Sequence, residues 1–304
     1  MLMRSYLSYI FVRYNYPTAP MAALLNAYDI LEKNAEFLPF VDKFHTKGEV
    51  PARNDVETVL DKISADSGVH PYTAKFVYYL CVTKRLPERY KEAGIPEEYF
   101  WEMLEDFRYK LMECLDVYGI AGFFANPWFY KFCTLEQFKL GRLEFELTAC
   151  PYDNIAIGGR IVKAGTETIN VHIPSDGGKF DREARFASYK KAYEFFRDYL
   201  GKDIDIFRCG SWLLYPPNRE ILPKHSNIVS FMDDFKIYQS ADYKDPQHDL
   251  WRIFGADATK PYSELPRDNS LRRAYADWLA SGHNVGGGDG IFIWDNEKND
   301  VITE

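Results

Sequence analysis

Residues 168–200 read TINVHIPSDGGKFDREARFASYKKAYEFFRDYL, and this stretch decides the fold. Polar and apolar side chains alternate up to Ile173, which predicts a strand, and the short loop SDGG follows at 175–178. The apolar spacing over 181–200 predicts an amphipathic helix. A strand that passes through a glycine-containing loop into a helix leaves backbone N–H groups at the end of a sheet, where phosphate-bearing ligands bind.

Further strands are predicted on both sides of this stretch. In LEQFKLGRLEFELTAC (135–150) the apolar residues change parity near Gly141, which predicts a β-bulge. The other expected strands lie at 154–162, 166–173, within 204–214, at 235–239 and at 291–294. The segment GGGDG (286–290) is predicted to be a flexible turn, because it lacks the strand–GxGxxG–helix order of a nucleotide site.

The first 125 residues are predicted to be helical. Apolar residues recur at helical spacing over 21–33, 55–63, 71–83 and 96–118, and Gly119 ends the last of these segments. The expected fold class is therefore α/β (α+β), with a helical N-terminal domain at 1–130. A mixed, mostly antiparallel sheet with flanking helices is expected at 131–304.

Composition restricts the possible partners and location. The chain has 304 residues and a formal net charge of −8, which argues against nucleic acid and an anionic membrane as partners. Five cysteines with no C-x-x-C spacing predict unpaired thiols in a reducing compartment, and the histidine spacing predicts no metal site. No apolar run is long enough to span a membrane and no convincing signal peptide is visible, so a cytoplasmic location is expected.

The order of these segments resembles the GNAT acyltransferase fold. LEQFKLGRLEFEL, VHIPSDGGKFDREA, CGSWLL and SNI (226–228) are similar to segments of a bacterial family of GNAT-like acyltransferases that have a helical N-terminal domain. The similarity covers nearly the whole chain. It implies an acyl-CoA-dependent N-acyltransferase that uses acetyl-CoA or another acyl-CoA and a small-molecule acceptor. The donor-binding residues that it implies are Ile173, Ser175, Gly177, Gly178 and Lys179.

The loop departs from the usual GNAT pattern Q/R-x-x-G-x-G/A. It lacks the leading Gln or Arg, and it carries acids at Asp176, Asp181 and Glu183. Asp181 suits a helix N-cap and Glu183 suits the positive end of the helix dipole, so both favour the helix itself. Their charges oppose a pyrophosphate, and Lys179 offsets only one of them.

Direct acyl transfer to an amine needs a base, a donor to the carbonyl oxygen and an acid for the leaving thiolate. His172 is a candidate base at the end of its strand, on the polar side with Thr168 and Asn170. The other interpretation is a histidine that only ties the loop. Glu144 and Glu146 are candidate bases, or else a solvated strand face partnered by Arg142.

Cys209, Ser211 and Tyr215 share parity on the neighbouring strand. Cys209 or Tyr215 is a candidate acid for the thiolate, although a strand cysteine is often only a small core residue. Two alternatives to acyl transfer remain open. One is a non-catalytic binding or regulatory module without a functional CoA site. The other is a hydrolase, which requires a histidine within hydrogen-bond reach of Cys209 or Ser211.

Overall fold

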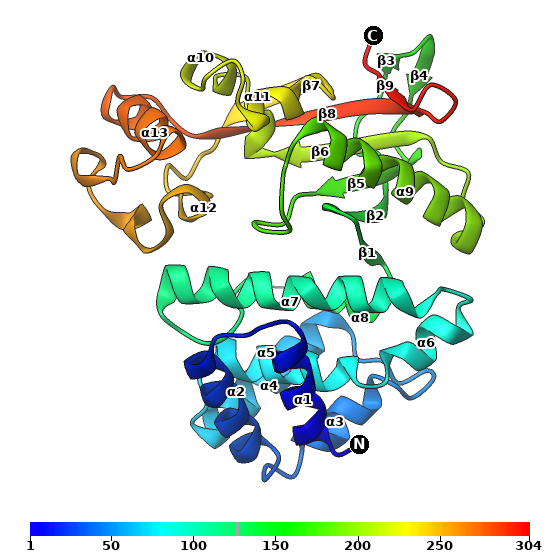
Figure 1. Ribbon diagram of the computed structural model, residues 1–304, viewed down its shortest axis with the longest axis vertical. Coiled ribbons are helices and arrows are strands. Elements are labelled where there is room, and N and C mark those ends of the chain that lie inside the picture. Colours follow the sequence, from blue (N-terminus) through cyan, green and yellow to red (C-terminus); the bar gives the residue numbers. More distant parts are fainter. Residues whose placement is uncertain (126–127) are drawn as a thin grey trace. The chain divides into compact units, whose positions relative to one another are not determined.

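The computed structural model describes residues 1–125 and 128–304, and these form two compact units, Met1–Phe138 and Lys139–Glu304. The first unit is helical and the second contains the sheet (Figure 1). Each unit is described by itself.

The helical unit is built around α5 (Pro71–Thr83), which is buried along most of its length. Pro71 occupies the first position of α5, where a missing backbone N–H costs nothing. The longest helix described in this unit, α7 (Glu97–Tyr118), ends at Gly119 in a left-handed conformation, as the sequence predicts. The other helices of this unit are α1 (Met3–Arg13), α2 (Thr18–Leu31), α3 (Phe37–Lys43), α4 (Arg53–Ser67), α6 (Leu86–Glu92) and α8 (Trp128–Cys133).

The core of the helical unit is rich in aromatic rings. The rings of Phe107 and Phe129 stack with centroids 3.8 Å apart, and Phe76 packs edge-on against both. Such pairs add to the free energy gained from burying apolar area. Most of the aromatic side chains in this unit therefore fill its core.

The sheet has the strand order β1-β2-β5-β6-β8-β7, with β9 paired to β8. β5 and β6 run parallel, whereas β2–β5, β6–β8, β7–β8 and β8–β9 are antiparallel. This is the mixed, mostly antiparallel sheet that the sequence predicts. The strands are β1 (Gln137–Leu140), β2 (Leu143–Ala149), β5 (Glu167–His172), β6 (Ile206–Ser211), β7 (Lys236–Asp242), β8 (Gly286–Asp295) and β9 (Asp300–Ile302).

α9 (Arg182–Leu200) covers one face of the sheet (Figure 1). Tyr189 on this helix packs against Phe207 of β6 and Phe292 of β8, whose rings stack with centroids 4.9 Å apart. Asp181 caps α9 by accepting a hydrogen bond from the Ala184 amide at 3.0 Å, as expected. The opposite face carries an apolar cluster around Ile291 and, beside it, the polar residues of the candidate site.

Two strand predictions are wrong in detail. Gly141 is not in a β-bulge but in a tight turn that separates β1 from β2, and its φ of 75° suits that turn. Chain reversal explains the change in parity. The strand expected at 154–162 is a separate hairpin of β3 (Ile155–Ile157) and β4 (Arg160–Val162), turned at the two glycines between them.

The predicted flexible turn GGGDG is also wrong, because these residues begin β8. A Cβ atom at Gly288 would collide with the carbonyl oxygen of Leu214, and one at Gly290 would lie 2.8 Å from Cβ of Phe235. The glycines therefore let the chain after β6 cross closely over a regular strand.

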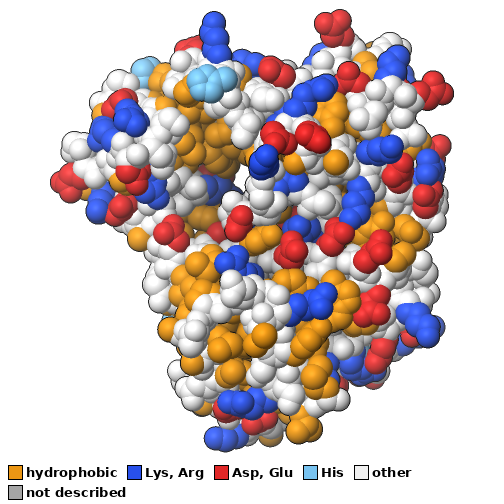
Figure 2. All heavy atoms as spheres, in the orientation of Figure 1, with side chains coloured by type: hydrophobic (Ala, Val, Ile, Leu, Met, Phe, Trp, Pro, Cys, Tyr) orange, Lys and Arg blue, Asp and Glu red, His pale blue; other side chains and the backbone are white. Residues whose placement is uncertain are grey.

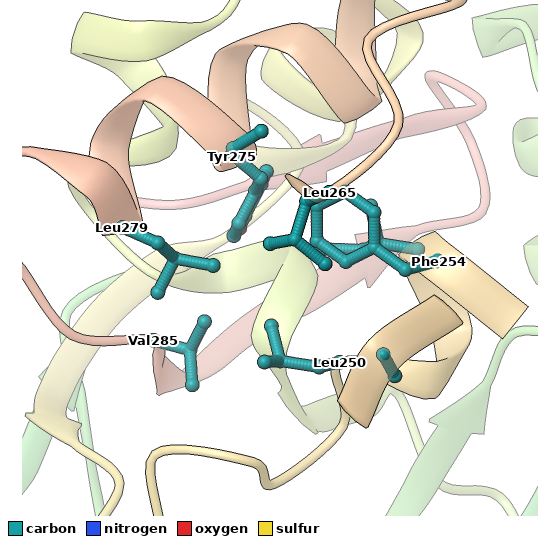
Figure 3. Packing of buried hydrophobic residues seen from close by; sticks show 9 residues of the cluster. Leu250, Phe254, Leu265, Tyr275, Leu279 and Val285 are labelled. Atoms are coloured by element: carbon teal, nitrogen blue, oxygen red, sulfur yellow. The ribbon is translucent and has the colours of Figure 1, made fainter. Parts of the chain in front are cut away.

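An apolar cluster beside this crossing holds the segment after β6, the 3₁₀ turn η1 (Trp212–Leu214). Figure 3 shows the cluster, in which Tyr275, Leu265 and Phe254 lie together. The Tyr275 hydroxyl donates to Asn218 Oδ1 at 2.5 Å, and the Asn218 amide donates to the carbonyl of Trp212 at 2.9 Å. The surrounding elements are α10 (Asn218–Ile221), α11 (Asn227–Met232), α12 (Trp251–Phe254), η2 (Gly255–Thr259), η3 (Tyr262–Glu264) and α13 (Ser270–Ala280).

Charged side chains of both signs are interspersed on the surface that Figure 2 shows. None of the helices in the described ranges is long and apolar enough to cross a bilayer.

Candidate functional site

Cross-strand register brings a row of polar residues onto the sheet face opposite α9. On β2 and β5, Glu144 pairs with His172 and Glu146 pairs with Asn170. Asn170 also pairs with Arg208 on β6. Because paired residues point to the same side of a sheet, these side chains share one face. Glu144 and Glu146 are buried, so the solvated strand face proposed as their alternative is wrong.

Glu146 is the hydrogen-bond acceptor at the centre of this row. Its Oε1 atom lies 2.9 Å from Nε2 of His172 and 3.1 Å from Nδ2 of Asn170. Nε2 of His172 also lies 3.1 Å from Nδ2 of Asn170, so Glu146, Asn170 and His172 form one group of polar contacts. His172 therefore contacts a buried carboxylate and a side-chain amide directly.

The pairing of β5 with β6 ends at this row of polar residues. Their parallel pairing covers only Ile169 with Phe207 and Asn170 with Arg208. β5 continues to His172, still paired to β2, and β6 continues to Ser211, still paired to β8. Beyond Asn170 and Arg208 no register pair joins β5 to β6, and we call this unpaired end of the two strands, with His172 on its β5 side, the wedge.

The loop after β5 leads into the N-terminus of α9. The Gly177 amide donates to Asp176 Oδ1 at 2.7 Å, while the amides of Gly178, Lys179 and Phe180 donate to no acceptor among the described residues. Those N–H groups are available to an anionic ligand. Ile173 and Ser175 precede them in the same loop.

A buried ion pair fixes the start of α9. Arg185, which is fully buried, lies 2.6 Å from Asp234 and also donates to the Phe180 carbonyl at 3.0 Å. Burial raises the pKa of Asp234, and the neighbouring guanidinium opposes that shift. Arg185 therefore ties the end of the loop, at Phe180, to the buried Asp234 carboxylate.

The structure does not bring Cys209 together with His172. Cys209 shares parity with Phe207, so its side chain lies on the α9 face, where burial raises the pKa of its thiol to about 12. In the described ranges neither Cys209 nor Ser211 hydrogen-bonds to a histidine, and Ser211 accepts from the Leu213 amide. The condition for a hydrolase is therefore not met.

Tyr215 lies beside Gly286, the first residue of β8. Its ring packs where a side chain on Gly286 would be, and its hydroxyl donates to Asp242 at 2.5 Å. Burial, reinforced by this carboxylate, raises the pKa of Tyr215.

Sequence reasoning missed two residues of this face, Arg208 and Asp289. Arg208 donates to the Thr148 hydroxyl at 3.1 Å, and Asp289 accepts from Tyr152 at 3.4 Å. The alternation of β6 was a usable signal for Arg208. Asp289 has no such signal, because the sequence GGGDG around it predicts a turn. Among residues 1–125 and 128–304 no three His, Cys, Asp or Glu side chains form a group that could hold a metal ion.

The chain matches two family models along most of its length. Residues 7–135 match an N-acyltransferase N-terminal domain and residues 137–292 match a GNAT-like C-terminal domain. No curated protein matches the chain.

Solved structures share the fold. An acyltransferase in complex with decanoyl-CoA and teicoplanin is 19% identical, with a TM-score of 0.63 over 94% of this chain and 98% of that one. An acyltransferase in complex with decanoyl-CoA is 22% identical, with a TM-score of 0.62 over 76% of this chain and 67% of that one. The resemblance that the sequence predicts is confirmed by these matches and by the sheet, and the chain belongs to the GNAT-like N-acyltransferase family.

Proposed function

We propose that this acyltransferase uses an acyl-CoA donor and transfers the acyl group directly to a nitrogen of a small acceptor. The observation that carries the proposal is the wedge between β5 and β6, which opens at His172. A thioester in that wedge would lie beside a histidine whose imidazole is held by a buried carboxylate. The catalytic unit in this proposal is the domain at 131–304, and the helical domain spans 1–130.

The donor is proposed to bind along the loop that follows β5. Its residues Ile173, Ser175, Gly177, Gly178 and Lys179 lead to the positive end of α9, where unpaired amides suit the phosphates of CoA. Solved acyltransferases of the same fold bind decanoyl-CoA, octanoyl-CoA and CoA. These neighbours support an acyl-CoA donor, whereas acetyl-CoA as the particular donor rests on the sequence resemblance.

The transfer step follows from the row of polar residues. The acceptor nitrogen attacks the thioester carbon, and its proton passes to His172 while Glu146 stabilises the resulting imidazolium. The C–S bond then breaks and CoA leaves as a thiolate, which takes up a proton. Glu144 is the reserve base, buried directly across from His172.

We assign the proton for the thiolate to Tyr215 rather than Cys209. The Tyr215 hydroxyl carries a proton at neutral pH, and it gives that proton to the thiolate only by turning away from Asp242, to which it donates in this structure. Cys209 is the weaker candidate because it is packed among the rings under α9. Tyr215→Phe should slow transfer without weakening donor binding.

A second candidate function is a binding or regulatory module that has lost donor binding. The observation that favours it is the acidic loop, where the Gly177 amide already donates to Asp176 and the Ala184 amide already donates to Asp181. Glu183 adds negative charge in the first turn of α9. We also propose a cytoplasmic location, because all five cysteines are buried and unpaired.

Titration calorimetry with CoA, acetyl-CoA, octanoyl-CoA and decanoyl-CoA tests the proposal. Saturable binding of an acyl-CoA, together with release of free CoA thiol when an amine is added, is the expected result. Absence of heat and of any thermal shift at millimolar ligand would contradict it and leave the binding-module alternative.

A further inference from the structure

Asp289 lies on the β6 side of the wedge, at the same level as His172. Asn170 pairs with Arg208, so the next positions on the same face are His172 on β5 and Gly210 on β6. Gly210 in turn pairs with Asp289 on β8. The sequence of positions across the sheet is therefore His172, the wedge, Gly210 and Asp289.

Gly210 leaves the space that the Asp289 carboxylate fills. A Cβ atom built on Gly210 would lie only 2.8 Å from Oδ1 of Asp289. The carboxylate thus leans from β8 over β6, toward the wedge. One strand separation of about 4.8 Å then divides the carboxylate from a ligand atom held between β5 and β6.

This carboxylate has little to satisfy it within the protein. Oδ2 accepts a long hydrogen bond of 3.4 Å from Tyr152, and Oδ1 accepts none from the described residues. Arg208 forms no ion pair with it in the described ranges and donates instead to Thr148 on β2, although its charge is near enough to favour the ionised Asp289. A half-buried carboxylate with one weak donor is suited to a donor from a ligand.

We propose that Asp289 binds a cationic amino group of the acceptor that is separate from the nucleophile being acylated, and so selects acceptors with two amino groups. The inference rests on the proposed acyl-CoA-dependent transfer. The nucleophile lies in the wedge beside His172, and a spacer of about four bonds brings the second, protonated amino group over Gly210 to Asp289. An acceptor whose single amino group is the nucleophile has no second, charged group for Asp289 and gains no affinity from it.

Three acceptors test whether the enzyme prefers a second, charged amino group: 1,4-diaminobutane, 4-amino-1-butanol and butylamine. They differ only in the group at the far end of the chain, and decanoyl-CoA is the donor. We expect kcat/KM for the diamine to exceed that for butylamine by on the order of tenfold to a hundredfold, the range of one charge-assisted hydrogen bond. Asp289→Asn, which can still accept from Tyr152, should abolish this preference through KM. Asp289→Glu should restore part of it. Asp198→Asn, which removes an exposed carboxylate from α9, is the matched control and should change nothing.

The outcomes distinguish the inference from the function on which it rests. A wild-type protein that binds decanoyl-CoA but does not prefer the diamine to both other probes would overturn the role of Asp289 and leave the proposed function standing. An undiminished preference in Asp289→Asn would overturn it equally. A wild-type protein that binds no acyl-CoA would overturn the proposed function itself.

Discussion

Oε1 of Glu146 lies 2.9 Å from Nε2 of His172, although Glu144 is the residue directly across from His172 on β2. The histidine therefore leans diagonally along the sheet toward the carboxylate that Asn170 also contacts. The contacts of Nε2 with Glu146 and with Nδ2 of Asn170 hold the ring on this face of the sheet, beside the proposed site of transfer.

His172→Gln should lower kcat for acyl transfer by about 10²- to 10⁴-fold, the usual contribution of a positioned general base. Glu146→Gln keeps an acceptor for Nε2 but loses the charge, so we expect a smaller loss of kcat. Donor affinity, measured by calorimetry, should not change in either variant. Glu167→Gln, an exposed residue of the same strand paired with Lys202, is the control. Full activity in His172→Gln would remove the histidine from the mechanism.

The acids of the loop should weaken donor binding. Asp176→Ala frees the Gly177 amide and removes one negative charge beside the proposed pyrophosphate position, so the Kd for CoA should fall severalfold at low salt. The gain should shrink as ionic strength rises. Titrations at two salt concentrations measure this, and an unchanged Kd would mean that the phosphates bind elsewhere.

Local periodicity was enough to predict four helices of the N-terminal unit, α2, α4, α5 and α7, and the strand–loop–helix. The helix at 182–200 and its cap at Asp181 follow from side-chain spacing and from one short polar residue, and both are local properties. The end of the strand at 286–295 is predicted, but its glycine-rich start at 286–290 is not, because these glycines are explained only by residues such as Leu214 and Phe235, which approach through tertiary packing.

The candidate site was predictable only within single strands. Alternation places Asn170 and His172 on one face, and this holds in the structure. Which face Cys209 occupies depends on the parallel register between β5 and β6, which no local pattern contains. Asp289 could not be found before its segment was known to be a strand.

Arg185→Met should destabilise the protein by about 3–5 kcal/mol, because it leaves the buried Asp234 carboxylate without its cation. Urea unfolding measures the change. Arg197→Met removes an exposed pair on the same helix and should have little effect. Combining Arg185→Met with Asp234→Asn should recover part of the loss, since no buried charge then remains. A loss as small as that of Arg197→Met would show that the ion pair does not hold α9.

The thiol of Cys209 should be unreactive in the folded protein. With burial raising its pKa to about 12, the thiol is protonated at neutral pH and should not react with a disulfide reagent in the folded protein. Cys209→Ser should keep kcat within about twofold, because the residue contacts the core rather than the site. Rapid labelling of Cys209 at pH 7, or loss of transfer in a correctly folded Cys209→Ser, would return it to the mechanism.

His45 should make the helical unit acid-sensitive. Burial, together with the nearby Arg85, lowers the pKa of His45 from 6.5 to about 4. Between pH 6.5 and pH 4 the unfolded chain therefore binds a proton that the folded chain does not, so the free energy of unfolding falls as the pH falls. Above pH 7 this contribution is constant. Urea unfolding at pH 7.5, 6, 5 and 4.5 should show an uptake of about one proton near pH 5 that His45→Gln lacks. Parallel pH profiles for the wild-type protein and His45→Gln would assign the acid sensitivity to carboxylates instead.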